Sequence, residues 1–182
     1  MPQLELTRGE YGLEGEIRLP AWEHWQIQEQ ARPIRVDFGG DRVEEGLELT
    51  ESYRTALAYI FAGQEQIQNA ILMGILEHLA QQEDDLLSDA MEDDFALHSG
   101  QGKIILPYAH EPADLLGELQ LEEIHILPVE RNGLCYIGYA FGCRWDEDGI
   151  GVMTCGSRVV EVGSRDTALL CWLAEDDLRH FH

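Results

Sequence analysis

An Asn-Gly pair at positions 132 and 133 constrains the fold of this chain more than any other feature. The pair lies between two apolar runs, EIHILPV and LCYIGYAF. Asn and Gly readily adopt the two positive φ angles of a type I′ turn, which joins antiparallel strands. We therefore predict a β-hairpin at this position. Asp148-Gly149 and Gly156-Ser157 mark two further turns, so we predict an antiparallel meander over about residues 122–163.

The N-terminal part is also predicted to be β-structure. Residues 4–8 and 13–19 alternate apolar and polar positions around a turn bounded by glycines, as two strands of a half-buried hairpin do. A third short strand is predicted at residues 34–38, the run IRVDF that is followed by two glycines. These N-terminal strands cover about residues 3–38. The conformation of residues 20–33 is left open.

The middle of the chain, about residues 50–98, has the 3.6-residue periodicity of helices. Thr50 is a suitable N-cap for a first helix, which Gly63 interrupts. A second helix is predicted over about residues 64–82. Its apolar positions cover more than half of its circumference, so we expect it to lie across a sheet and under another element. Residues 83–97 are predicted to form a solvated amphipathic helix.

The grouping of these elements indicates an α+β fold. Strands with short connections flank a helical middle, whereas an α/β fold would alternate strands and helices along the chain. Pro112 suits the first position of a short helix over residues 113–119. We expect a C-terminal antiparallel meander and an N-terminal hairpin, packed against a central pair of helices. The length of 182 residues fits a single domain spanning the whole chain.

The composition is strongly acidic, with 35 Asp and Glu residues against 12 Lys and Arg residues and a formal net charge of −23. Lys103 is the only lysine, and the arginines form no clustered run. Nucleic acids and anionic membranes are therefore not expected as partners, because both would repel this chain. Two interpretations of the acidity remain open: a solubilising surface, or a surface that attracts a basic protein.

The sequence predicts a cytoplasmic protein. Its N-terminus lacks the continuous apolar region of a secretory signal, and no uncharged run approaches the ~20 apolar residues of a membrane helix. The four cysteines form no CxxC pair, so we interpret them as reduced thiols. They are Cys135, Cys143, Cys155 and Cys171.

Asp146, Glu147 and Asp148 form the most chemically suggestive cluster, and they directly follow Trp145. Adjacent carboxylates can hold a divalent cation. A calcium loop would need further oxygen ligands, and its pattern fails because Ile150 occupies one of the required positions. Acidic residues before a glycine are also ordinary turn chemistry. We prefer the turn interpretation and keep metal or acid–base chemistry as the alternative.

Other catalytic patterns are missing from the sequence. No HExxH motif, GxSxG elbow or phosphate-binding glycine loop occurs, so we expect no cofactor. The glycines of residues 137–143 are interpreted as positions of close packing or twist within a strand. The four tryptophans are predicted to pack in the core rather than to form a binding surface; they are Trp22, Trp25, Trp145 and Trp172. Of the seven histidines, only His180 and His182 are close in sequence, and both lie in the C-terminal tail.

Residues 145–152, WDEDGIGV, and the following run RVVEVG resemble a bacterial family of uncharacterised proteins with the hairpin W-D-E-E-H-G-x-G-V followed by R-V-V-x-V-G. The similarity spans roughly residues 50–168. It implies a bacterial cytoplasmic α+β domain. The family's histidine before the glycine is missing here, and Cys155 stands at a later histidine position, which argues against a shared histidine–carboxylate site. The candidate binding residues are Trp145, Asp146, Glu147, Asp148, Arg158 and Asp166; no catalytic residue or metal ligand is assigned.

Three functional hypotheses follow. The first is a non-enzymatic interaction protein, by analogy an immunity-type inhibitor, whose acidic face binds a basic partner. The second is a metal-dependent hydrolase or metal-binding protein that combines Asp146, Glu147 and Asp148 with a histidine supplied by the fold. The third is a structural subunit with an exposed apolar patch. The sequence does not determine the oligomeric state.

Overall fold

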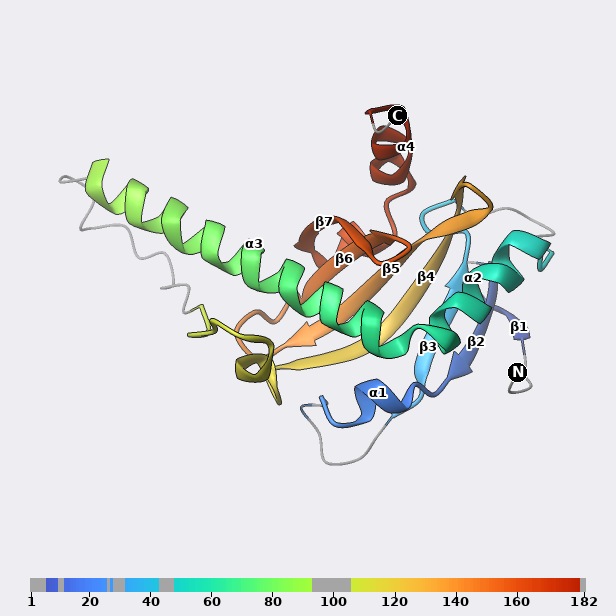
Figure 1. The fold of residues 1–182 in the computed structure, drawn as a ribbon, viewed down its shortest axis with the longest axis horizontal. Coiled ribbons are helices and arrows are strands. Elements are labelled where there is room, and N and C mark those ends of the chain that lie inside the picture. Colours follow the sequence, from blue (N-terminus) through green and yellow to red (C-terminus); the bar gives the residue numbers. More distant parts are fainter. Residues whose placement is uncertain are drawn as a thin grey trace.

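Seven strands form one sheet whose spatial order is the order along the chain (Figure 1). The computed structural model describes residues 6–9, 12–25, 27, 32–42, 48–92 and 106–180. Neighbouring strands are antiparallel except β3 and β4, which are parallel. The strands are β1 (Leu6–Gly9), β2 (Gly12–Ile17), β3 (Ile34–Phe38), β4 (Leu119–Arg131), β5 (Leu134–Cys143), β6 (Ile150–Cys155) and β7 (Arg158–Ser164).

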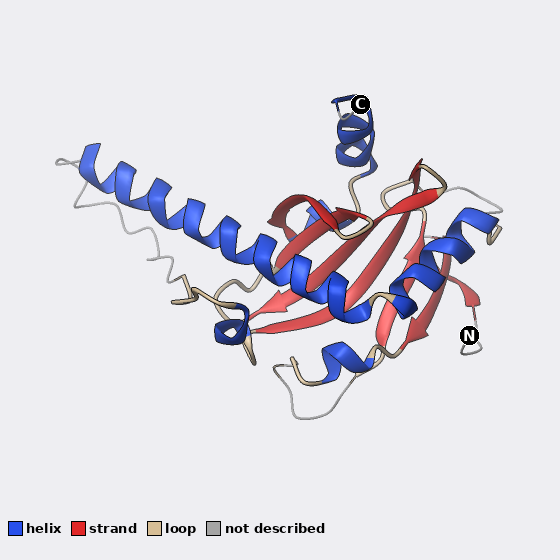
Figure 2. Ribbon diagram, in the orientation of Figure 1, coloured by secondary structure: helices blue, strands red, loops and turns tan. Residues whose placement is uncertain are grey.

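The helices lie on both faces of this sheet, and the mixture confirms the predicted α+β class (Figure 2). Two helices, α2 and α3, cover one face, which we call the helical face. The 3-10 helix η2 and helix α4 pack on the opposite face, which we call the second face. The helical elements are α1 (Pro20–Glu23), α2 (Glu51–Ala62), α3 (Gln64–Glu92), α4 (Cys171–His180), η1 (Pro112–Leu115) and η2 (Arg165–Ala168).

Helix α2 begins and ends where its sequence predicts. The Thr50 side chain accepts a hydrogen bond from the Tyr53 backbone N–H at 3.3 Å, and Gly63 is the C-cap residue. Helix α3 then continues to Glu92, ten residues past its predicted end at residue 82. The segment predicted as a separate amphipathic helix is thus the continuation of α3 as far as Glu92, and its last residues lie outside the described ranges.

The main core lies between the sheet and the helical face. Alternate residues of each strand point into it, and α2 and α3 supply one buried stripe each. On β3 these residues are Ile34, Val36 and Phe38, which are at most 2% exposed. Trp22 packs here too, with its ring 5.4 Å from that of Phe141. Removal of this apolar surface from water is the main favourable contribution to holding the two layers together.

The second face has a smaller core and a close approach of backbone to backbone. Helix α4 contributes Cys171 and Ala174, which pack against residues of β4, β5 and β6. Next to them η2 crosses the sheet over glycines. An ideal Cβ at Gly138 would lie 1.6 Å from the Ala168 carbonyl oxygen, and one at Gly151 would lie 2.5 Å from that of Arg165. The close-packing interpretation of the β5 glycine Gly138 is therefore supported.

Several expectations are corrected by the structure. Helix α4 and the parallel pairing of β3 with β4 were not predicted. Trp172 is 55% exposed on α4, so the prediction that it packs in the core is wrong, whereas Trp25 and Trp145 pack partly buried against the core. Met73 on α3 is 43% exposed, so the outer side of α3 is not fully buried under another layer. The predicted helix over residues 113–119 is a single 3-10 turn, η1.

Within the described ranges, no helix combines the length and apolar character needed to cross a membrane. The four cysteines are free thiols. Burial raises the pKa of Cys135 to about 11 and the pKa values of Cys143 and Cys171 to about 12. These three thiols are therefore protonated at neutral pH.

Candidate functional site

The acidic cluster predicted from the sequence forms the turn between β5 and β6. Asp146, Glu147 and Asp148 are all exposed there. The Asp148 backbone N–H donates to the Asp146 Oδ1 at 3.0 Å, and the Gly149 N–H donates to the Asp146 carbonyl oxygen at 3.2 Å. Gly149 has φ of 78°, a conformation that glycine adopts readily. The Asp146 carboxylate therefore has a structural role in the turn, as side-chain oxygens of Asp commonly do.

The described residues form no metal site at this turn. No group of three or more His, Cys, Asp or Glu side chains is arranged to hold a metal ion among the residues that the structure describes. The described histidines that pair with acidic residues pair with acids outside this turn. His125 contacts Asp37 and Glu123, and His180 contacts Asp176. The structure thus brings no described histidine to the Asp146–Asp148 turn.

Arg158 lies at the opposite end of the β6–β7 hairpin from that turn. The register pairs Cys155 with Arg158 at one end and Ile150 with Ser164 at the other. Arg158 donates two hydrogen bonds to the Asp177 carboxylate, at 3.0 and 2.5 Å. The Tyr136 hydroxyl donates to the same carboxylate at 2.7 Å. Arg158 therefore anchors α4 to the sheet and does not join the acidic turn.

Asp166 lies in η2, at the same end of the sheet as the acidic turn. Its carbonyl oxygen accepts a hydrogen bond from the Leu169 N–H at 3.0 Å and so closes the 3-10 turn. Within the described ranges no hydrogen bond or ion pair joins its carboxylate to Asp146, Glu147 or Asp148. The six candidate residues are thus divided among the β5–β6 turn, η2 and the anchor of α4.

A network of charged side chains on the second face was not predicted. His125 is 4% exposed, with its Nδ1 2.9 Å from the Asp37 Oδ1 and its Nε2 3.5 Å from the Glu123 Oε2. Arg35 lies 3.7 Å from Asp37 and 3.3 Å from Glu123. Arg165 of η2 joins the network through Glu123 at 3.7 Å, and it also donates a hydrogen bond to Glu122 at 2.7 Å. Both nitrogens of the buried imidazole face carboxylates, so this histidine is placed for structure rather than for contact with a substrate.

One sequence signal could have identified part of this network. In the run IRVDF, Arg35 and Asp37 alternate with three core residues, so both must lie on the face opposite the helices. His125 lies opposite Asp37 only because β3 and β4 pair in parallel. Such non-local pairing is not readable from local periodicity, and the network therefore could not be predicted.

The ion-paired arginines and the acids of α3 lie in different parts of the molecule, although α2 on the helical face also carries the exposed Arg54. At least six of the eleven arginines form ion pairs with described residues, on or beside the second face. The pairs involve β2, β3, β4, β7, η2, α4 or the loop after β3. These arginines are Arg35, Arg42, Arg131, Arg158, Arg165 and Arg179. Helix α3 on the helical face contains no lysine or arginine. It has seven acidic residues: Glu65, Glu77, Glu83, Asp84, Asp85, Asp89 and Glu92.

The C-terminal part of α3, residues 80–92, which we call distal α3, extends past the sheet (Figure 1). Residues 81–85 are all exposed, and three of these five are acidic. On a helix that packs against a surface, five successive residues cannot all avoid that surface, because they cover more than one turn. Distal α3 is therefore surrounded by solvent at this point, and Glu83, Asp84 and Asp85 present negative charge over more than half of its circumference.

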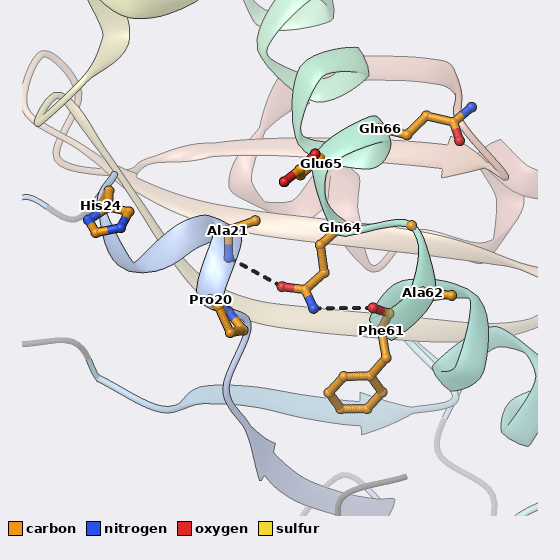
Figure 3. A pocket seen from close by; sticks show the side chains of 9 residues that line it. Pro20, Ala21, His24, Phe61, Ala62, Gln64, Glu65 and Gln66 are labelled. Atoms are coloured by element: carbon orange, nitrogen blue, oxygen red, sulfur yellow. Dashed lines mark hydrogen bonds between the residues drawn. The ribbon is translucent and has the colours of Figure 1, made fainter.

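An open hollow of about 650 Å³ lies where α1 meets the junction of α2 and α3 (Figure 3). Gln64 spans this junction: the Ala21 N–H donates to its Oε1 at 3.2 Å, and its Nε2 donates to the Phe61 carbonyl at 3.1 Å. Gln68 adds a hydrogen bond to the Ala21 carbonyl at 2.7 Å. The polar groups of Gln64 attach α1 to the helices, and only His24 and Glu65 contribute ionisable side chains to the lining.

Comparison with known proteins gives one match. A family model described as a domain of unknown function, DUF6985, matches residues 13–169, which include the sheet from β2 to β7, α2 and α3 and end before α4. No curated protein sequence and no solved structure shows significant similarity to the chain.

Proposed function

This chain belongs to the DUF6985 family, and from the charges of the molecule we propose that it is a non-enzymatic interaction protein of the bacterial cytoplasm that binds a basic protein partner, as an immunity-type inhibitor does. The observation that carries this proposal is distal α3. It combines exposed acidic residues with projection beyond the sheet. Helix α3 itself contains no lysine or arginine, and at least six of the eleven arginines are engaged in ion pairs on or beside the second face.

The position of these acids within α3 is electrostatically unfavourable. The C-terminal end of a helix bears a partial negative charge, so the acidic residues of the last turn, Asp89 and Glu92, cost about a few tenths of a kcal/mol each. The last turn of α3 contains no basic residue to offset that charge. Glu83, Asp84 and Asp85 add repulsion among themselves. A cationic partner would relieve both effects, and this relief adds a favourable contribution to the free energy of binding.

The reactive side chains of the described residues support binding rather than chemistry. His125 is buried between two carboxylates, where a substrate does not reach it. The raised pKa values of Cys135, Cys143 and Cys171 keep these thiols protonated at neutral pH, and a protonated thiol is a poor nucleophile.

The test begins with capture of basic proteins from a bacterial lysate on the tagged full-length chain, followed by calorimetry with the purified partner at low and high salt. We expect the affinity to fall steeply with salt, because exposed charges are screened. The variant Glu83→Gln/Asp84→Asn/Asp85→Asn should bind about tenfold more weakly, since three exposed ion pairs contribute roughly 1–2 kcal/mol together.

A matched control is available within the same chain. The variant Asp146→Asn/Glu147→Gln/Asp148→Asn removes the same number of exposed charges at the β5–β6 turn and should retain wild-type affinity. Failure to recover a basic partner, or an affinity that does not change with salt, would contradict the proposal. Loss of binding in the control variant alone would move the site to the turn.

The metal-dependent alternative has its own test. The geometry of Asp146, Glu147 and Asp148 gives it no support, because the described part of the chain places no histidine beside them. Metal analysis of protein purified without an affinity tag decides the question. A stoichiometric divalent cation that is lost in the triple variant of the turn would favour this alternative over the interaction protein.

A further inference from the structure

Strand β7 is the last strand of the sheet, and its outer edge is open. It pairs with β6 on one side, and the described ranges place no strand on the other. An open edge of this kind presents backbone N–H and C=O groups that can pair with an extended segment of another chain. The edge is long enough to do so, because β7 has seven residues and strands are usually about five or six residues long.

Helix α3 packs against β7 on the helical face of the sheet. An ideal Cβ at Gly74 would lie 3.0 Å from the Val159 side chain, so the helix and β7 are in close contact there. One turn later, burial lowers the pKa of His78, and the charge of the Glu161 carboxylate acts in the opposite direction. Fourteen further residues of α3 follow His78 up to Glu92; at 1.5 Å per residue they extend about 20 Å.

The charges beside the open edge of β7 and on distal α3 indicate which kind of chain segment would bind there. Glu161 is exposed on β7, and residues 83–85 of α3 are exposed acids. Helix α3 adds no positive charge. An arriving strand would therefore meet negative charge from both elements, and a basic segment fits best. A second copy of this chain fits poorly, because each copy has a net charge of −23.

The other edge of the sheet is different. The described part of β1 has four residues, and one of them is Arg8. The main sheet contacts of α3 are with β6 and β7, and those of α2 are with β4 and β5. The two edges can therefore be compared within one molecule.

We infer that the open edge of β7 receives an extended basic segment of the partner as an eighth strand, with its backbone hydrogen-bonded to β7 and its basic side chains facing the acids of Glu161 and distal α3. This inference rests on the proposed function and adds the site and the mode of binding. Backbone pairing supplies affinity in such strand addition, and the alternate side chains supply specificity.

The test is amide hydrogen exchange by NMR on the full chain. The probe is a peptide of about eight residues, a typical strand length, with the repeat Arg-Arg-Val-Val, so that arginines lie on both faces of the added strand. Because amides of an edge strand point alternately inward and outward, we expect alternate residues between Val159 and Ser164 to exchange at least about tenfold more slowly with peptide bound. The amides of β1 should not change.

Two controls separate strand addition from charge attraction. A peptide of the same sequence with every backbone nitrogen methylated keeps its charges but cannot donate to β7, and it should give no protection. Glu161→Gln should weaken binding of the unmodified peptide severalfold. Glu16→Gln, which removes an exposed acid from β2 near the other edge, should leave binding unchanged.

The outcomes also distinguish this inference from the proposed function. Protection that is uniform, lies elsewhere, or is equal with the methylated peptide overturns strand addition at β7, as does the absence of binding. If a basic partner is captured in a salt-dependent way but β7 gains no alternate protection, the function stands and this site is wrong. Alternate protection without any captured partner supports the site and contradicts the function.

Discussion

At the scale of single residues, Gly138 sets how closely η2 can approach the sheet. A methyl group there would lie 1.6 Å from the Ala168 carbonyl oxygen, far inside van der Waals contact. Backbone cannot move aside as the end of a flexible side chain can. We expect Gly138→Ala to lower the free energy of unfolding by about 3 kcal/mol or more, at or above the upper end of usual overpacking costs. Urea unfolding measures this difference.

The loss of stability in Gly138→Ala is compared with the loss in a control variant, Gly133→Ala. Gly133 has φ of 80° and no atom within 4 Å of an added Cβ, so its substitution costs only the left-handed backbone conformation, about 1–2 kcal/mol. An equal loss of stability in the two variants would show that η2 moves away easily and that the contact at Gly138 is unimportant.

Individual turn and cap residues were the most readable part of the sequence. Asn132 and Gly133 have φ of 55° and 80°, as the predicted type I′ turn requires. Thr50 caps α2 as predicted. In each case the information is local, since a residue's own backbone preference or its side-chain hydrogen bond determines the outcome.

At the scale of elements, the Asp177 carboxylate anchors α4 to the sheet. Asp177 accepts hydrogen bonds from Arg158 and Tyr136, and its side chain is 7% exposed. Burial raises the pKa of Asp177, but these hydrogen bonds and the charges of Arg158 and Arg131 outweigh it, so the pKa lies below its ordinary value. We expect Asp177→Asn to lower the free energy of unfolding by about 2–3 kcal/mol, as for hydrogen bonds to a charged group.

The pH dependence of this effect has a definite sign. A carboxyl group with a lowered pKa in the folded state stabilises that state above its unfolded pKa, about 3.9 for Asp, and this contribution disappears as the pH falls through the folded value. The difference in unfolding free energy between wild type and Asp177→Asn should be constant above about pH 5 and narrow below about pH 4. A difference that persists at low pH would show that Asp177 acts through shape and not charge.

Helices and strands with a regular apolar pattern were predictable from the sequence. The pairing of strands that lie far apart in the sequence was not. The hairpins of β4–β7, the pair β1–β2 and both large helices were all predicted, because each is encoded within a short stretch of chain. Helix α4 was missed because its buried contacts are made by small residues, Cys171 and Ala174, which give a weak apolar pattern. The parallel pairing of β3 and β4 links segments far apart in sequence, and no local signal reports it.

At the scale of the whole molecule, the acidity was evident from composition, but its distribution was not. The candidate residues chosen from the sequence lie in three separate places, because a linear motif does not reveal which ends of a hairpin its residues occupy. Arg158 and Asp166 follow the same turn in sequence, yet they lie at opposite ends of β7. Distal α3 was recognised as acidic and solvated, whereas its projection past the sheet required the arrangement of the other elements.

The net charge predicts how salt affects stability. Repulsion among the exposed acids opposes compact packing, and added salt screens it, with a Debye length near 10 Å at about 0.1 M. We expect the melting temperature to rise by about 2–4 °C between low and moderate NaCl, equivalent to roughly 1 kcal/mol. KCl should act equally, because screening does not depend on the cation. A fall in melting temperature would instead show that the ion pairs of the second face dominate.

The parallel contact between β3 and β4 also affects the protein while it is being synthesised. Phe38 pairs with Ile126, 88 residues later in the chain (126 − 38 = 88). At a translation rate of about 5–20 residues per second, β3 emerges roughly 4–18 s before β4, the strand that pairs with its second edge. Helices α2 and α3 emerge in that interval and can cover one face of the β1–β3 unit. During translation, therefore, β3 is exposed as a temporary edge that a chaperone, or a second nascent chain, would encounter first.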